Sequence, residues 1–175
     1  MKQVLLLALL SLFAIACDKK SPSQPQLPPA TQTLANTAGC YINGKLFETH
    51  TEGFWSGSYV NHQRVNHGAD SAIHISMSCA NPQKMFFIIM KYNLWNRDFV
   101  IGYDDPFVVT FFDYTGSTAS TGLNTFKSDA THQFYVHLTN YYPTGLCCGT
   151  FHGTLVNDNG QEVKITEGRF DIAYQ

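Results

Sequence analysis

The chain has 175 residues, with 11 Lys and Arg against 13 Asp and Glu, so its formal net charge of −2 excludes the strongly basic surface typical of nucleic-acid binding. Charged residues make up only 14% of the sequence and aromatic residues another 14%, a composition that favours β-strands over helices with charged solvent-facing sides. The length suits one domain with a hydrophobic core.

The N-terminal leader is an uncharged apolar run at residues 4–16, VLLLALLSLFAIA, which follows Lys2 and ends before Cys17. It is shorter than the about 20 residues of a membrane-spanning helix but has the length of a signal-peptide core. Ala16 before Cys17 resembles the lipobox of bacterial lipoprotein precursors, which implies cleavage before Cys17 and acylation of its sulfur and amino group. We therefore expect residues 1–16 to be a lipoprotein signal peptide and Cys17 to anchor an outer membrane lipoprotein, on the periplasmic face or at the cell surface. The alternatives are a plain secretory signal and an uncleaved anchor.

A polar, proline-rich spacer follows the expected lipid anchor. Residues 17–37 hold four of the seven prolines and no aromatic residue, which is typical of a semi-rigid tether without the apolar content to pack. We expect it to hold a single β domain, residues 38–175, clear of the lipid headgroups. A proline-rich ligand for another protein is the alternative.

The first half of the domain shows the patterns of β-strands. Asn43-Gly44 separates two short apolar stretches, and both residues accept the positive φ of a type I′ hairpin turn. Residues 49–68 are polar and indicate an irregular strand and a loop. From Ser71 one face is apolar, and at residues 85–90 (MFFIIM) both faces are apolar, as in a central strand covered on both sides. The apolar positions of the strand that begins at Ser71 are Ile73, Ile75, Met77 and Cys79.

The second half predicts further short strands joined by turns. They are expected at residues 99–103, 107–112, 132–142, 148–156, 161–166 and 169–174. The turn at residues 157–160 (NDNG) makes a hairpin, and residues 167–168 (EG) are expected to break its second strand. No stretch of the sequence repeats apolar residues with the 3.6-residue period of an amphipathic helix. The sequence therefore predicts an all-β fold, an antiparallel sandwich or barrel of about eight to ten short strands.

Both ends of the domain resemble one protein family. Residues 149–151 (GTF) and 163–172 (VKITEGRFDI) are similar to the ending of a family of Bacteroidota envelope lipoproteins of unknown function, and residues 42–45 (INGK) are similar to its opening hairpin. The resemblance implies a compact β domain on an acyl anchor, without a known catalytic residue. In such bacteria, acidic residues after the lipidated cysteine direct export to the surface; here Asp18 is followed by two lysines.

Four cysteines follow the expected lipidated one, and an exported chain meets an oxidising compartment, so we expect disulfides. The four are Cys40, Cys79, Cys147 and Cys148. Because neighbours on a strand point to opposite faces, Cys147, on the inward parity, and Cys148 need different partners. We expect one bond from Cys40 to this pair and a second that involves Cys79. The alternative is a catalytic thiolate at Cys148 assisted by His152.

Seven histidines raise the question of a metal or haem site. His74, His137 and His152 each take the polar parity of a strand, so neighbouring strands could bring them together. The sequence has no His-x-His, His-Glu-x-x-His or Cys-x-x-Cys pattern, which are the spacings of zinc sites. The turn at residues 157–160 lacks the first and last ligands of a calcium loop. Solvated histidines are the simpler interpretation, and no cofactor is expected.

Aromatic residues support a second functional hypothesis. Trp55, Tyr59, Trp95 and Tyr103 lie among polar or turn residues, where flat rings stack on sugars. Residues 70–72 (Asp-Ser-Ala) are similar to a Bacteroidota O-glycosylation acceptor. No Gly-x-Ser-x-Gly motif or phosphate-binding loop occurs, so no enzyme is expected. The sequence predicts a non-enzymatic envelope lipoprotein with a binding or structural role and a glycan or an envelope protein as partner; the alternatives are a glycan-binding accessory lipoprotein and a haem or metal carrier.

Overall fold

The structure is a computed structural model that describes residues 26–50, 59–67, 70–80, 83–91, 97–102, 107–114, 124–142 and 145–173. These residues form eleven antiparallel β-strands and no helix, which confirms the all-β prediction. None of them belongs to a helix with the length and apolar character that a membrane crossing needs.

The strands agree with most of the expected ranges. They are β1 (Thr37–Ile42), β2 (Lys45–His50), β3 (Tyr59–His67), β4 (Asp70–Ala80), β5 (Gln83–Lys91), β6 (Asp98–Ile101), β7 (Val109–Asp113), β8 (Asn124–Lys127), β9 (Phe134–Tyr141), β10 (Leu146–Val156) and β11 (Glu162–Ala173). The expected turn at Asn43-Gly44 is present, with φ values of 49° and 76°. Strand β8 was not predicted, because Phe126 is the only buried residue among its four and leaves no alternation to recognise.

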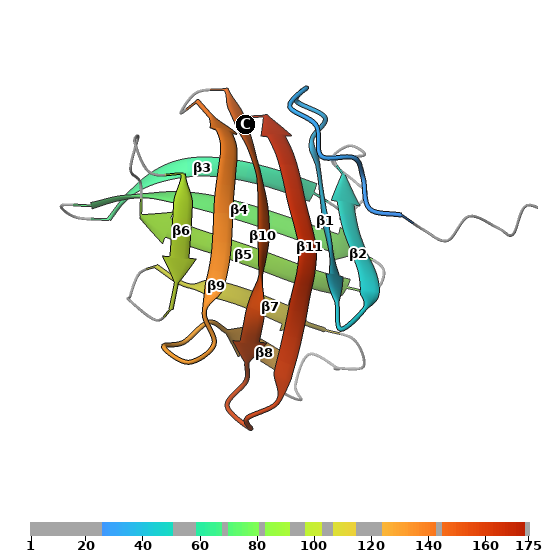
Figure 1. The fold of residues 1–175 in the computed structure, drawn as a ribbon, viewed down its shortest axis with the longest axis vertical. Coiled ribbons are helices and arrows are strands. Elements are labelled where there is room, and N and C mark those ends of the chain that lie inside the picture. Colours follow the sequence, from blue (N-terminus) through green and yellow to red (C-terminus); the bar gives the residue numbers. More distant parts are fainter. Residues whose placement is uncertain are drawn as a thin grey trace, which may run out of the picture.

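The strands form one continuous sheet that folds into two layers. The order along the sheet is β2-β1-β11-β10-β8-β7-β5-β4-β3, and β9 also pairs with β10 while β6 pairs with β9. The fold occurs at β10, which pairs with β9 along Cys147–Gly153 but with β8 only at Val156 and Lys127. In Figure 1 the strands of the first layer (β6, β9, β10, β11, β1 and β2) cross those of the second. Crossed layers of this kind are one of the two common ways in which sheets pack face to face.

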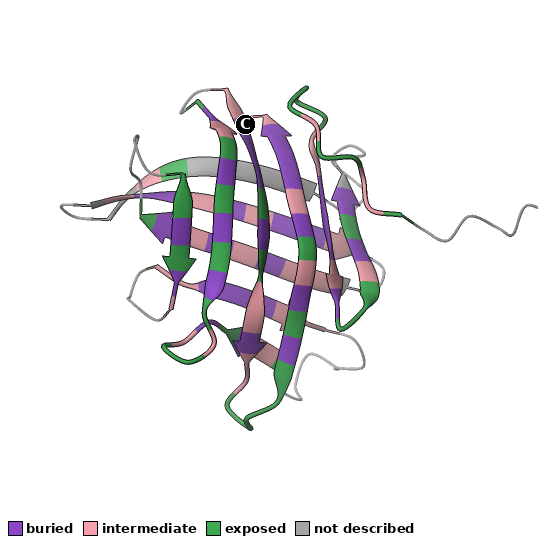
Figure 2. Cartoon of the chain, viewed as in Figure 1, coloured by how far each residue is buried: buried purple, intermediate pink, exposed green. Residues whose placement is uncertain are grey.

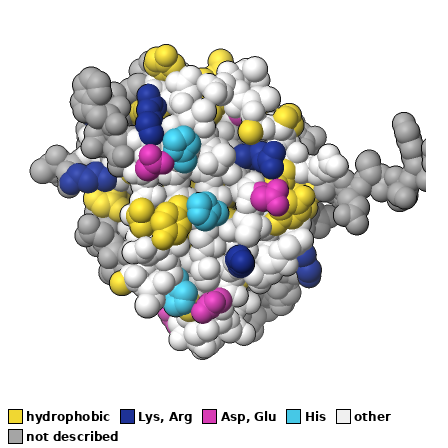
Figure 3. Space-filling model, in the orientation of Figure 1, with side chains coloured by type: hydrophobic (Ala, Val, Ile, Leu, Met, Phe, Trp, Pro, Cys, Tyr) yellow, Lys and Arg dark blue, Asp and Glu magenta, His cyan; other side chains and the backbone are white. Residues whose placement is uncertain are grey.

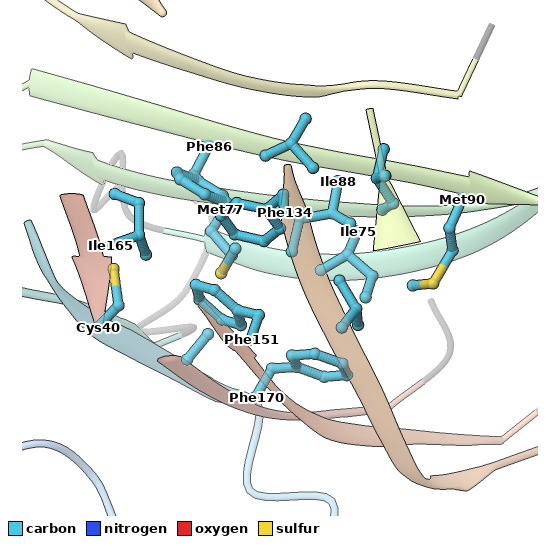
Figure 4. Close-up of a cluster of buried hydrophobic side chains, with 14 of the residues drawn as sticks. Cys40, Ile75, Met77, Phe86, Ile88, Met90, Phe134, Phe151, Ile165 and Phe170 are labelled. Carbon is cyan, nitrogen blue, oxygen red and sulfur yellow. The ribbon is translucent and has the colours of Figure 1, made fainter. Parts of the chain in front are cut away.

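Aromatic rings fill the space between the layers. The ring of Phe151 in β10 lies 5.6 Å from that of Phe86, 5.8 Å from that of Phe134 and 6.1 Å from that of Phe170, so both layers contribute to one cluster (Figure 4). Along β9, buried and exposed residues alternate, as Figure 2 shows. Each fully buried ring stabilises the fold by about 2–3 kcal/mol through its removal from water. The polar and titratable side chains considered below lie mostly on the outer faces of the two layers.

Strand β11 contains a bulge where the sequence predicted a break. Its pairing with β1 and with β10 shifts register around Glu167 and Gly168, and Glu167 has a φ of 53°. A Cβ atom on Gly168 would lie 2.3 Å from the Phe151 ring, so only glycine fits there. The strand therefore continues from Glu162 to Ala173 with a local change of direction.

Candidate functional site

The outer side of β6, β9 and β10 carries exposed rings next to polar side chains that contact one another. We call it the β6–β9–β10 face and define it by Asp98, Val100, Tyr135, His137 and His152. Val100 pairs with Tyr135, which pairs with His152, so these three form one row across three strands. Asp98 pairs with His137 in the adjacent row. Figure 3 views this side of the molecule, where histidine side chains lie beside hydrophobic and acidic ones.

Two direct contacts organise this face. The rings of Tyr135 and His152 stack with their centroids 5.1 Å apart and their planes 12° apart. His137 Nδ1 lies 2.7 Å from Asp98 Oδ1, so the carboxylate orients the imidazole. Tyr135 and Val100 remain 41% and 59% exposed, so both side chains are accessible to a ligand. The face thus offers a stacked pair of rings and an exposed Val100 next to hydrogen-bonding groups, an arrangement that a ring-shaped ligand can contact.

A second polar cluster lies at the lower end of the same layer. His132 contacts Asp129 through Nδ1 at 2.9 Å and Glu162 through Nε2 at 3.2 Å. The side-chain hydrogen bond to Asp129, followed by that to Glu162, raises the pKa of His132, and the same imidazole lowers the pKa of Asp129. A hollow of about 470 Å³ beside the cluster is lined by Lys127, Asp129 and Asp158 among others. The three-residue cluster joins the segment after β8 to β11, which is a structural role.

The third feature is a buried carboxylate that holds the chain preceding β1. Asp171 in β11 is 2% exposed and points away from the core, on the opposite parity from the buried Phe170 and Ile172. It accepts hydrogen bonds from Thr31 Oγ1 at 2.5 Å and from the amides of Thr33 at 2.9 Å and of Leu34 at 3.1 Å. Burial alone would raise the pKa of Asp171, but these hydrogen bonds outweigh it and lower the pKa.

Residues 26–36, the N-terminal segment, therefore contact the β domain. Further contacts lie on both sides of Asp171: Arg169 Nη1 donates to the Pro28 carbonyl at 3.2 Å, and the Ala173 amide donates to Asn36 Oδ1 at 2.8 Å. In Figure 1 the segment, in blue, runs beside β1. The sequence predicted a spacer over residues 17–37, and its second half is held by polar contacts that its composition does not reveal.

Cys40, Cys147 and Cys148 are free thiols, so neither the disulfide expected between Cys40 and the Cys147–Cys148 pair nor a second one from Cys79 to these cysteines is present in this structure. Strand order explains this for Cys40 and Cys147, because β11 lies between their strands, and Cys40 lies opposite the β11 bulge whereas Cys147 lies opposite Ile172. With strands about 4.8 Å apart and about 3.3 Å per residue, their Cα atoms are roughly 16 Å apart, and a disulfide needs about 4.4–6.8 Å. The expected parity is confirmed: Cys147 lies in the core and Cys148 on the opposite side, against Asp171.

The thiols do not form a nucleophilic site. Burial, with a further contribution from the hydrogen bond to Asp171, raises the pKa of Cys148 to about 12, and burial raises that of Cys40 to about 12. These thiols therefore stay protonated at neutral pH. The ring of His152, which was considered as a base for Cys148, stacks on Tyr135 instead.

The histidines considered as metal ligands are divided between the two layers. His137 and His152 lie on the β6–β9–β10 face, but His74 belongs to β4 in the second layer. Among the residues that the structure describes, no group of three or more His, Cys, Asp or Glu side chains is placed to hold a metal ion.

Several other predicted residues lie outside the described part. Cys17, Trp55, Trp95 and Tyr103 are among them, as is the side chain of Tyr59, whose backbone begins β3. At the possible glycosylation site, the Ser71 hydroxyl accepts a hydrogen bond from Arg64 at 3.2 Å.

Comparisons of the chain with protein-family models, with curated proteins and with solved structures found no match. Residues missed by the sequence analysis are therefore identified from the structure alone. The alternation of β9 predicted that Tyr135 points outward, so a signal for the β6–β9–β10 face existed in the sequence. The alternation of Phe170 and Ile172 likewise placed Asp171 outward, but nothing indicated what covers it.

Proposed function

We propose that the chain is a cell-envelope lipoprotein, anchored in the outer membrane through acylated Cys17, whose β domain has a non-enzymatic binding or structural role. The observation that carries this proposal is the apolar leader that ends in Ala16-Cys17. Within the β domain, the thiols of Cys40 and Cys148 are buried and protonated, which argues against the thiolate nucleophile considered as the alternative.

Metabolic labelling with a radioactive fatty acid tests the anchor. The wild-type chain is expected to incorporate label and to enter the detergent phase on phase partitioning, because two or more acyl chains give stable membrane binding. Cys17→Ser should abolish both, whereas the control Cys79→Ser should retain both. Labelling of the Cys17→Ser chain, or an unlabelled wild-type chain, would contradict the proposal.

A second candidate function is glycan binding by the β6–β9–β10 face. The specific observation in its favour is the exposed row of Val100, Tyr135 and His152, with Asp98 and His137 one row away to bind hydroxyl groups. Pyranose rings stack on the flat faces of aromatic side chains. Such a contact requires a face of the aromatic ring that is exposed to solvent. The residues of this face differ from the four aromatic residues that the sequence suggested for glycan binding. The role of those four, Trp55, Tyr59, Trp95 and Tyr103, stays a prediction.

Screening on an array of neutral bacterial and plant polysaccharides, followed by calorimetry on any hit, tests this function. Tyr135→Ala is expected to lower affinity at least tenfold. Tyr142→Ala removes a still more exposed tyrosine (61% against 41% for Tyr135) outside this face and should have no effect. Equal losses in both variants, or no binding to any glycan, would refute it.

A further inference from the structure

We propose that the N-terminal segment acts as a latch on Asp171, and that its closure sets how far the β domain extends from the membrane. The closure rests on contacts among described residues. Its effect on membrane distance rests on the proposed lipid anchor at Cys17.

The backbone of the N-terminal segment wraps around the carboxylate. The amide of Thr33 donates to Oδ2 and that of Leu34 to Oδ1, and the Thr31 hydroxyl adds a third donor at 2.5 Å. Successive amides that converge on one anion form a backbone nest, which normally holds a phosphate or a carboxylate. From the other side, Cys148 Sγ donates to Oδ1 at 3.1 Å. The carboxylate is thus surrounded by donors from two separate parts of the chain.

The conformation of the segment depends on this carboxylate. Leu34 has a φ of 62° although it is neither glycine nor asparagine, and its side chain is 49% exposed. A leucine in the left-handed region is unfavourable without compensating contacts, and an exposed side chain supplies few. The amide of Leu34 donates directly to Asp171, and this hydrogen bond compensates for the unfavourable φ of Leu34.

Other contacts of the segment include the hydrogen bonds of Pro28 with Arg169, of Gln32 with Asn140 and of Asn36 with Ala173. Leu27 and Pro28 also lie against the sheet, where a Cβ atom on Gly39 would be 3.0 Å from Leu27 Cδ2 and 3.2 Å from Pro28 Cδ. Residues 32–35 are exposed, so the part of the segment that surrounds the carboxylate has little apolar contact and is able to open while the β domain stays folded.

Opening changes the reach of the tether. With the segment closed, the chain between Cys17 and Gln26 spans at most about 30 Å even when fully extended. With the segment open, free chain runs from Cys17 to Thr37 and spans at most about 65 Å. The latch would therefore allow roughly a doubling of the distance between the β domain and the lipid.

Hydrogen–deuterium exchange on the mature full chain tests the closure. The amides of Thr33 and Leu34 should be protected in the wild type. Leu34→Pro removes one donor and imposes a negative φ, so exchange at Thr33 should rise at least tenfold. Leu34→Gly keeps the amide and accepts the positive φ, so protection should be retained or increased. Unprotected amides in the wild type, or an unchanged Thr33 in Leu34→Pro, would overturn the latch.

Neutron reflectometry of the lipidated chain on a supported bilayer tests the reach. The protein layer of Leu34→Pro should extend further from the bilayer than those of the wild type and of Leu34→Gly. Equal layers despite increased exchange in Leu34→Pro would overturn the effect on distance. A wild-type chain without lipid would contradict the proposed anchor and leave the exchange result standing, so the two failures are distinguishable.

Discussion

Asn43 in the first hairpin is bound to Lys164 in the last strand. Asn43 Oδ1 accepts the Lys164 amide at 2.8 Å, and the Asn43 amide donates to the Lys164 carbonyl at 2.9 Å. The turn residue thereby extends the pairing of β1 with β11 by one position. Its φ of 49° suits asparagine, which tolerates the left-handed region better than most residues.

Substitutions of Asn43 should separate the contribution of its side-chain hydrogen bond to Lys164 from that of its tolerance for positive φ. Asn43→Gly keeps the backbone conformation but removes the side-chain acceptor, and we expect a loss of about 1 kcal/mol in the free energy of unfolding. Asn43→Ala adds strain at positive φ, for a total of about 2–3 kcal/mol. Urea denaturation followed by circular dichroism measures both values, and equal values for the two variants would contradict the role of φ.

Gly149 should not tolerate a methyl group. A Cβ atom at this position would lie 2.2 Å from the His137 carbonyl oxygen and 2.8 Å from Cζ of Phe170. Gly149→Ala is expected to destabilise the fold by about 2–3 kcal/mol through backbone displacement. Gly145, whose Cβ would only reach Tyr142 at 3.7 Å, is the control, and Gly145→Ala should change stability by less than about 1 kcal/mol. Thermal unfolding of both variants decides whether the glycine requirement is local.

His132 should titrate above its usual pKa of about 6.5. Its hydrogen bond to Asp129 is the main cause and that to Glu162 a lesser one. A raised pKa in the folded state stabilises the fold below the unfolded pKa, and this stabilisation is lost as the pH rises through the folded pKa. NMR titration of the imidazole should show that Asp129→Asn lowers the pKa more than Glu162→Gln does. The reverse order would contradict the assignment of Asp129 as the main partner.

Asp171 should make closure of the N-terminal segment dependent on acid. Its pKa is lowered because the hydrogen bonds from the segment outweigh the effect of burial. The stabilisation is therefore present above the unfolded pKa of about 3.9 and is lost as the pH falls through the folded pKa. The Cys148 thiol and an N-terminal segment without charged residues face the carboxylate, and Arg169 of the same strand donates to the Pro28 carbonyl of that segment. The arginine stays charged over this pH range, so Asp171 is the group that titrates.

Amide exchange at Thr33, corrected for the intrinsic pH dependence, measures this acid opening. Asp171→Asn places an amide donor among the donors that face the carboxylate and should open the segment at every pH. An Asp171→Asn chain with the protection of the wild type would show that the carboxylate is not what holds the segment.

The sequence predicted those parts of the fold that depend on local pattern. The Asn43-Gly44 turn follows from the φ preferences of its own two residues. Ile73, Ile75 and Met77 are all buried, as the alternation of β4 indicated. Turn type and the alternation of buried and exposed side chains along a strand can be predicted because they depend mainly on residues that are close in sequence.

The parts that were missed depend on strand order and register. Parity placed Cys147 and Cys148 on opposite faces, but the expected partner Cys40 is two strands away because β11 inserts between β1 and β10. Residues 167–168 were expected to break a strand, whereas the structure uses them as a bulge against Phe151. The sequence did not predict that the N-terminal segment covers Asp171. The hydrogen bonds to this carboxylate come largely from backbone amides, which every segment has.

The central position of β11 has a consequence for synthesis of the chain. This strand is synthesised after the other ten described strands, yet β1 and β10 pair with its two sides. Folding of the first layer must therefore wait until β11 has emerged. A prematurely terminated chain without Glu162–Ala173 would leave two unsatisfied strand edges, each a template for a neighbouring molecule. Such fragments are expected to aggregate or to be degraded by proteases.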